Sequence, residues 1–152
     1  MTRGNARELA VHLIYAREFT GDEPQMVIAT RLEKEYYGML SEESPVYEDR
    51  PSKAQRAYID CVVMGVASRV DELNETIAKL SVGWDISRIS RLARTIMQLA
   101  MFEIQYVDDV PTGVAIAEAV RIAKLYDGDD ASGFINGILG TFARSLSTEV
   151  EV

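Results

Sequence analysis

Histidine and cysteine, the most common side-chain ligands of zinc, are scarce in this sequence of 152 residues. One histidine, His12, and one cysteine, Cys61, cannot supply the ligands of a zinc site, and the two Glu-x-x-His pairs of a helical di-iron site are absent. The segment "DGDD" at 127–130 lacks the downstream glutamate of an EF-hand loop, and no glycine-rich phosphate-binding signature occurs. The residue types therefore favour an adaptor over an enzyme, and they predict no metal and no cofactor.

Three aromatic residues are placed where recognition chemistry is possible. Tyr15, Tyr126 and Phe134 lie off the apolar stripes of the helices expected around them, and Phe134 is about 100° from Ile135 on a helical wheel. A partly exposed ring can stack on an unpaired base or anchor a protein partner. The alternative is that each ring lies at the edge of the core, and spacing alone leaves both interpretations open.

Arginines gather in two parts of the chain, although the net charge is −8. Arg3, Arg7 and Arg17 lie on the first expected helix, and the stretch "ISRISRLARTIMQLAMF" at 86–102 holds three arginines and no acid. The negative net charge argues against a general grip on nucleic acid, which needs many phosphate contacts, but it allows a local basic face. The alternatives are solvated helix faces, or a protein-interaction module, possibly a homodimer, that binds no RNA.

The composition is that of a globular protein, with 47% apolar and 26% charged residues. We expect a single helical domain over residues 1–147 and a loose C-terminal tail at 148–152. Cys61 stands in the apolar run "YIDCVVMGV", which predicts a small buried side chain with no internal disulfide. No run of about 18 apolar residues occurs, so neither a signal peptide nor a membrane span is expected, and we predict a cytoplasmic protein.

Apolar residues recur at helical spacing along most of the chain, which predicts an all-α protein. An acidic loop is expected at 41–51, and the pattern leaves open whether one helix or two follow it. Together these helices predict a compact bundle of six or seven helices. The ranges that we expect to be helical are 5–19, 24–40, 52–70 with a continuation to 80, 85–106, 112–126, and a last helix around 135–146.

The last two helices carry three further expectations. Gly137 and Gly140 predict a close approach of the last helix to a neighbour. Glycine inside a helix is less stable than alanine, and close packing of the two helices would compensate for that loss. Asp130 or Ser132 is expected to cap that helix. Glu118 is expected to be a partly buried acid that pairs with an arginine, since an unpaired buried carboxylate would be costly.

Three blocks of the sequence resemble the NusB family of bacterial transcription antitermination factors. The resemblance covers about residues 3–146 and implies two packed three-helix bundles without catalytic activity. It also implies a partner, the small-subunit ribosomal protein NusE, with which family members bind the boxA segment of nascent ribosomal RNA and help RNA polymerase to read through terminators. The blocks are "ARELAVHLIY", "RLARTIMQLAMFEIQY" followed by "DVPTGVAIAEAVRIAKLYDG", and "FINGIL".

The resemblance also implies which residues form the binding surface. Tyr15, Tyr126, Asp130 and Phe134 fall where the family builds its surface for RNA, and the three aromatic residues among them also fall where it meets NusE. Arg3 and Arg7 fall in the basic N-terminal region, which reads "TRGNAR" here and is less rich in arginine than in many members. The RNA-binding domains that accompany ribosomal RNA cytosine methyltransferases are also similar, but these 152 residues hold no methyltransferase segment.

Overall fold

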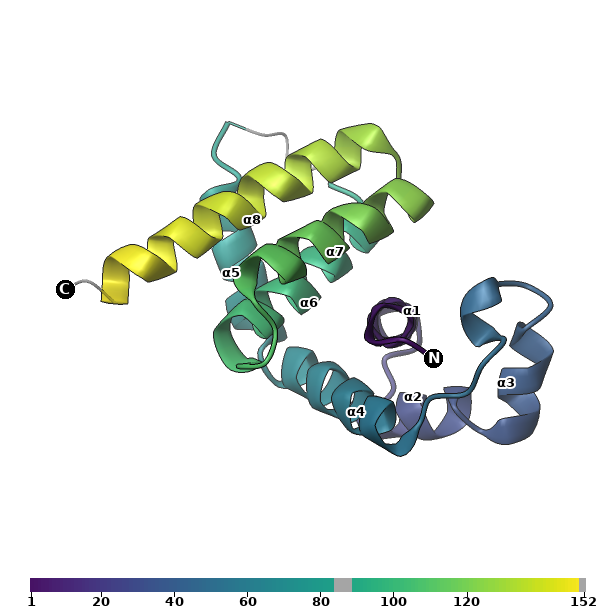
Figure 1. Cartoon of the computed structure of the whole chain (residues 1–152). Coiled ribbons are helices and arrows are strands. Elements are labelled where there is room, and N and C mark those ends of the chain that lie inside the picture. The colour runs from purple at the N-terminus through teal and green to yellow at the C-terminus, as the bar shows by residue number, and fades with distance from the viewer. Residues whose placement is uncertain (84–88, 151–152) are drawn as a thin grey trace. The chain divides into compact units, whose positions relative to one another are not determined.

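The computed structural model describes residues 1–83 and 89–150, and these residues form eight α-helices, one short 3-10 helix and no strand (Figure 1). The predicted all-α class is thereby confirmed. The helices divide into two compact units, an N-terminal unit (Met1–Ser68) and a C-terminal unit (Arg69–Val152). We describe each unit by itself.

The N-terminal unit is built around three helices that contact one another. Helix α1 (Arg3–Thr20) packs on α2 (Pro24–Arg31) and on α4 (Lys53–Ser68), and α2 also contacts α4. This is one of the expected three-helix bundles, and α3 (Lys34–Leu40) and the 3-10 helix η1 (Pro45–Tyr47) lie beside it. The buried apolar residues that hold it together include Ala6, Leu9, Leu13, Val27, Ile28, Ile59, Val62 and Val66.

Helix α1 begins two residues earlier than the sequence predicted, because Thr2 caps it. The Thr2 hydroxyl oxygen accepts a hydrogen bond from the Asn5 amide at 3.0 Å, which satisfies one of the free amides of the first turn. The helix ends at Gly21, whose φ of 70° lies in the left-handed region that glycine adopts without strain. These caps place Arg3 and Arg7 in the first two turns of the helix.

The single helix predicted over residues 24–40 was wrong, because the chain leaves the helical conformation at Glu33. Glu33 has an extended backbone with ψ of 136°, and its carboxylate accepts hydrogen bonds from the amides of Glu35 and Tyr36 at 3.1 and 3.0 Å. The side chain therefore caps a new helix, and these two bonds lower the pKa of the Glu33 carboxyl. The split raises the number of helices above the predicted six or seven.

The acidic segment 41–51 is anchored to the N-terminal unit by two tyrosines. Tyr37 donates hydrogen bonds to the carbonyl oxygens of Asp49 at 2.6 Å and Val46 at 3.2 Å, and its ring meets that of Tyr47 edge-on at 5.3 Å. Burial raises the pKa of both phenols to about 12, so both hydroxyls stay protonated. The segment is therefore not a simple loop, because η1 inserts Val46 and Tyr47 into the core.

The question of one helix or two after residue 52 is answered by a break at Arg69. Its φ of −123° and ψ of 17° separate α4 from α5 (Val70–Leu80). The predicted burial of Cys61 was wrong, because the thiol is exposed. Ile59 and Val63 face the core, and the helical repeat turns Cys61, midway between them, to the opposite side.

The C-terminal unit also has a core of three mutually contacting helices, α6 (Arg91–Tyr106), α7 (Thr112–Tyr126) and α8 (Asp129–Val150), with α5 packed on α6 and α8. Figure 1 shows α7 and α8 side by side. The predicted central role of α6 is confirmed, since it is buried on nearly all sides from Thr95 to Glu103. Helix α6 was predicted to begin at residue 85, but it begins at Arg91, where the Ser90 hydroxyl caps it. Residues 84–88 lie outside the described part of the chain.

Helix α8 begins at Asp129, earlier than expected, so the predicted cap by Asp130 or Ser132 was wrong. The turn from α7 is made by Gly128, whose φ of 95° is left-handed and whose amide donates to the Ala123 carbonyl at 3.0 Å. Ser132 lies inside the first turn, where its hydroxyl donates to the Asp129 carbonyl at 2.8 Å. The predicted loose tail at 148–152 overlaps the end of α8, and its residues 151–152 lie outside the description.

The predicted close approach at Gly137 and Gly140 was also wrong. Gly137 is exposed, and a Cβ atom added there would meet no atom within 4 Å. A Cβ at Gly140 would lie 3.4 Å from the flexible end of Arg144 and no closer to any neighbouring helix. Helix α8 instead packs through its larger apolar residues, which are Phe134, Ile135, Ile138, Leu139 and Phe142.

Candidate nucleic-acid interface

The first two turns of α1 present two arginines to one aromatic ring of α4. The guanidinium carbon of Arg3 lies 4.5 Å from the ring centroid of Tyr58, and that of Arg7 lies 5.8 Å from it. Both distances fall within the range of cation–π attraction. The surroundings of the arginines differ, since Arg3 is exposed and Arg7 is 3% exposed.

The start of α4 holds this arrangement in place. Ser52 and Gln55 form the expected capping box, with the Gln55 amide donating to the Ser52 hydroxyl at 3.3 Å and the Ser52 amide donating to the Gln55 side chain at 3.0 Å. The side-chain amide of Gln55 also donates to the carbonyl of Met1. The N-terminus, two residues before Arg3, is thus hydrogen-bonded to α4.

Tyr15 lies two turns beyond Arg7 on α1 and is partly buried. Its ring meets that of Phe19 nearly edge-on, with centroids 5.0 Å apart and planes at 72°. Phe19 is 56% exposed, so the pair forms a partly exposed aromatic site near the end of α1. The sequence singled out Tyr15 and passed over Phe19, although the spacing of four residues signals a pair on one helix face.

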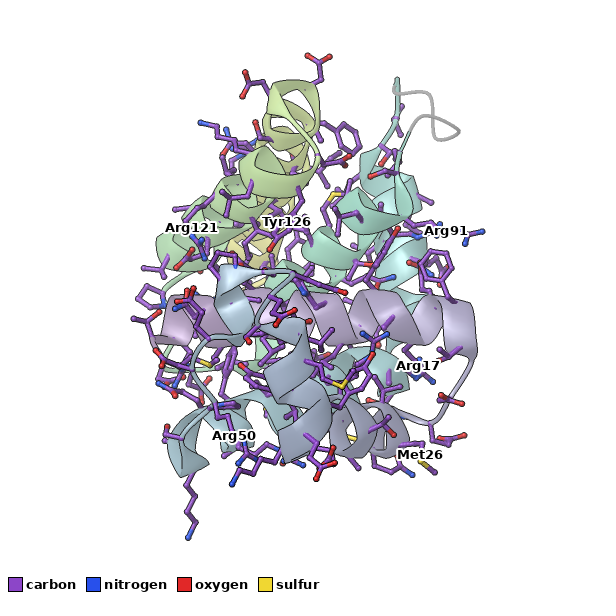
Figure 2. All side chains as sticks on the ribbon, turned by 90° about the vertical axis from the view of Figure 1, so that its right-hand side faces the viewer. Arg17, Met26, Arg50, Arg91, Arg121 and Tyr126 are labelled. Carbon is purple, nitrogen blue, oxygen red and sulfur yellow. The ribbon has the colours of Figure 1, made fainter. Side chains whose placement is uncertain are left out.

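A second group of predicted residues surrounds the turn between α7 and α8. Tyr126 is 42% exposed at the end of α7, beside Leu125, which is also exposed, and Asp130 is exposed in the first turn of α8. Figure 2 shows Tyr126 and Arg121 on α7. Arg121 donates to the carboxylate of Glu118, which confirms the expected pairing of that acid.

Of the two interpretations that spacing left open for Phe134, the structure supports burial. Its side chain is 8% exposed, although it follows Asp130 by one helical turn. The wheel placed the inward stripe of the last helix on Ile135, Ile138 and Phe142 alone. Because α8 packs against three other helices, its buried face is wider than this stripe and includes Phe134. Tyr126 and Asp130 therefore share the surface of the turn, and Phe134 lies beneath it.

The turn is also bonded to the start of α6. The hydroxyl of Ser90 donates to the carboxylate of Asp127 at 2.5 Å, and the same hydroxyl oxygen accepts from the Ala93 amide at 2.9 Å. Asp127 is the last residue before Gly128, so the bond fixes the end of α7 relative to α6. Arg91, the first residue of α6, is exposed (Figure 2).

The one histidine belongs to the anchor of the acidic segment. His12 Nδ1 is 2.8 Å from the Tyr47 hydroxyl, and burial lowers the pKa of His12, with an opposing effect of Glu8 and a smaller lowering effect of Arg31. Within residues 1–83 and 89–150, no three side chains of histidine, cysteine, aspartate or glutamate are grouped as a metal site would require. In the same part of the chain, no helix is long and apolar enough to cross a membrane.

The six predicted site residues thus fall into two groups, one in each unit. Arg3 and Arg7 meet at one ring, and Tyr15 lies farther along the same helix. The second group consists of Tyr126, Asp130 and the buried Phe134. Sequence reasoning missed Tyr58, because no pattern links it to an arginine about 50 residues away until α1 packs on α4.

Comparison with known proteins places the chain among antitermination factors. A model of the NusB family matches residues 4–144. The transcription antitermination protein NusB of Acetivibrio thermocellus is 40% identical over 95% of this chain and 90% of its own length. The transcription antitermination protein NusB of Natranaerobius thermophilus is 35% identical over 97% of this chain and 98% of its own length.

Solved structures show the same fold. T. maritima NusB superposes with a TM-score of 0.73 at 24% identity, over 95% of this chain and 92% of that one. NusB in a crystal structure of the antitermination factors NusB and NusE with double-stranded RNA also gives a TM-score of 0.73, at 20% identity, over 94% of this chain and 96% of that one.

Proposed function

The chain belongs to the NusB family, and on that basis we propose that it is a transcription antitermination adaptor that binds boxA RNA of nascent ribosomal RNA transcripts together with NusE. The observation that carries this proposal is the 40% identity to an antitermination protein over 95% of the chain. The adaptor has no catalytic activity of its own and works in the cytoplasm as part of an RNA polymerase antitermination complex.

Two features of the described residues support RNA binding. Arg3 is an exposed cation at the start of α1, where the first turn holds no acidic residue. The positive end of the helix dipole and the guanidinium therefore both favour a phosphate at this place. Tyr126 offers an exposed ring on which an unpaired base can stack.

The proposed need for NusE follows from the charge of the chain. With 24 acidic and 16 basic residues, long-range repulsion opposes RNA, and a local basic face has to overcome it. A partner that adds phosphate contacts or places the RNA would supply the missing attraction. The affinity of the chain alone is therefore expected to be weak.

The test is binding of labelled boxA RNA to the protein alone and with NusE, with a scrambled RNA as control. We expect tight, sequence-dependent binding only with NusE, weakening as salt rises because counterions are released from the phosphates. Absence of binding under both conditions would overturn the proposal. It would favour the alternative of a protein-interaction module, which the net charge of −8 and the 61% exposure of Leu125 would then support.

Tyr126 gives a sharper test of the proposed surface. Replacement Tyr126→Ala should weaken the complex with RNA and NusE about tenfold, in line with the contribution of base stacking. Tyr126→Phe, which keeps the ring, should bind within about twofold of the unaltered protein. Both variants should unfold at nearly the same urea concentration as the parent, because the side chain is exposed at the end of α7 and is not part of the buried core. Equal binding by the alanine variant would remove Tyr126 from the site.

A further inference from the structure

Tyr58 of α4 contacts both N-terminal arginines of α1. The residue is 6% exposed, and the guanidinium carbons of Arg3 and Arg7, on successive turns of α1, lie 4.5 and 5.8 Å from its ring centroid. Residues four apart lie on the same helix face, which is why one ring meets both guanidinium groups. A planar guanidinium stacks on an aromatic ring better than an ammonium does.

The two arginines are not equivalent in this arrangement. Arg3 is exposed and closer to the ring, so its guanidinium lies near Tyr58 while its side chain remains accessible from solvent. Arg7 is 3% exposed, so a phosphate cannot reach it without movement of the surrounding side chains. The sequence alone placed both in one basic region.

We propose that Tyr58 is a positioning residue of the RNA interface, which holds the Arg3 guanidinium in place as a phosphate contact, while Arg7 stabilises the packing of α1 on α4 and does not touch RNA. This inference rests on the proposed function. A long arginine side chain loses conformational entropy when it binds a phosphate. Contact with an aromatic ring restricts the side chain before binding, so less entropy is lost when the phosphate binds. One preordered arginine explains how a chain with the sparse "TRGNAR" start can still contact RNA.

A double-mutant cycle on Arg3 and Tyr58 tests the inference, with boxA RNA and NusE as the probe and salt concentration as the second variable. Arg3→Gln should weaken binding and lower the slope of log affinity against log salt by about 0.7, the value for one lost contact to a single strand. Tyr58→Leu should weaken binding about threefold, as expected for a lost cation–π contact. In the Tyr58→Leu background, the loss of affinity caused by Arg3→Gln should be about threefold smaller than in the parent, so the two changes should not add.

Three further variants separate lost contacts from lost folding and test the role of Arg7. Tyr58→Phe keeps the ring and should bind within about twofold of the parent, because the cation–π contact needs only the aromatic face. Arg3→Lys keeps the charge at an exposed position and leaves the core intact, yet it should bind more weakly, because lysine does not stack as a plane. Arg7→Gln should leave the salt slope unchanged. Unfolding by urea identifies any variant that is not folded.

The outcomes separate the inference from the function on which it rests. If the parent binds boxA RNA but the Arg3 and Tyr58 effects add independently, or Arg3→Lys binds as the parent does, the positioning role is wrong while the adaptor function stands. If Arg7→Gln lowers the salt slope as Arg3→Gln does, Arg7 contacts RNA and the division of roles is wrong. If the parent itself binds no RNA with NusE, both the function and the inference fail.

Discussion

At the scale of single residues, the two aromatic side chains around the turn between α7 and α8 differ in exposure. Tyr126 and Phe134 are both aromatic residues of the predicted surface, eight positions apart around the same turn. Tyr126 is 42% exposed and Phe134 is 8% exposed. Substitutions at the two positions should therefore change different properties of the protein.

An aspartate at each of the two positions gives the clearest comparison. Phe134→Asp should lower the free energy of unfolding by about 3 kcal/mol or more, because it removes a buried ring and places a charge in the core. Phe134→Leu, which stays apolar, should cost about 1 kcal/mol. Tyr126→Asp should change the free energy of unfolding much less, by about 0.5 kcal/mol, because Tyr126 is exposed and is not part of the buried core. Urea unfolding measures all three, and a fully stable Phe134→Asp variant would show that the ring lies outside the core.

At the scale of elements, the backbone requires glycine at one of two positions in the C-terminal unit and not at the other. Gly128 makes the turn between α7 and α8 with a φ of 95°, where a side chain would be strained. Gly137 lies inside α8 with open space around its Cα. The close packing that the sequence predicted for Gly137 is absent, and the need for glycine lies nine residues earlier in the turn.

Replacement of each glycine by alanine tests this contrast. Gly128→Ala should lower the free energy of unfolding by about 1 to 2 kcal/mol, because alanine is strained in the left-handed region. Gly137→Ala should raise it by about 0.5 to 1 kcal/mol, because alanine has the higher helix propensity and meets no neighbour. Thermal or urea unfolding of the two variants side by side is sufficient. Loss of stability at Gly137 would mean that something does pack there.

At the scale of the whole molecule, the titration of His12 links stability to pH. Burial lowers the pKa of His12 below its usual value of 6.5, with Glu8 opposing and Arg31 assisting. Between the lowered pKa and 6.5, the unfolded chain binds more protons than the folded one. The contribution of neutral His12 to the free energy of unfolding is therefore complete above pH 6.5. It is lost progressively as the pH falls from 6.5 to the lowered pKa.

The prediction is a difference between two pH profiles. The parent should lose stability between pH 6.5 and the folded pKa, and His12→Gln should lack that part of the slope, since it cannot take up the proton. Urea midpoints measured from about pH 8 down to about pH 5 supply the comparison. Identical slopes in the two profiles would mean that His12 titrates equally in the folded and unfolded chains.

Much of the architecture could be predicted from the sequence alone, because it follows from local patterns of residues. The helical spacing of apolar residues predicted both ends of α7, and it predicted the ends of α1 to within two residues. It also predicted the end of α6 but placed its start six residues too early, and Ser52 with Gln55 signalled the start of α4. The break at Glu33 was missed, because apolar residues continue at steps of four through Leu32 and Tyr36. There the Glu33 carboxylate accepts hydrogen bonds from the amides of Glu35 and Tyr36, which a continuous helix would bond to backbone carbonyls.

The sequence by itself determined the all-α class, the family and the residue types available for recognition, since these depend on periodicity and on motifs that are local to the chain. Only the tertiary structure decided that Phe134 is buried, that Cys61 is exposed, and that Arg3 and Arg7 share the ring of Tyr58. The physical reason is the same in each case. Exposure depends on which helices pack against a given face, and that pairing joins residues far apart in the sequence, which no local pattern can specify.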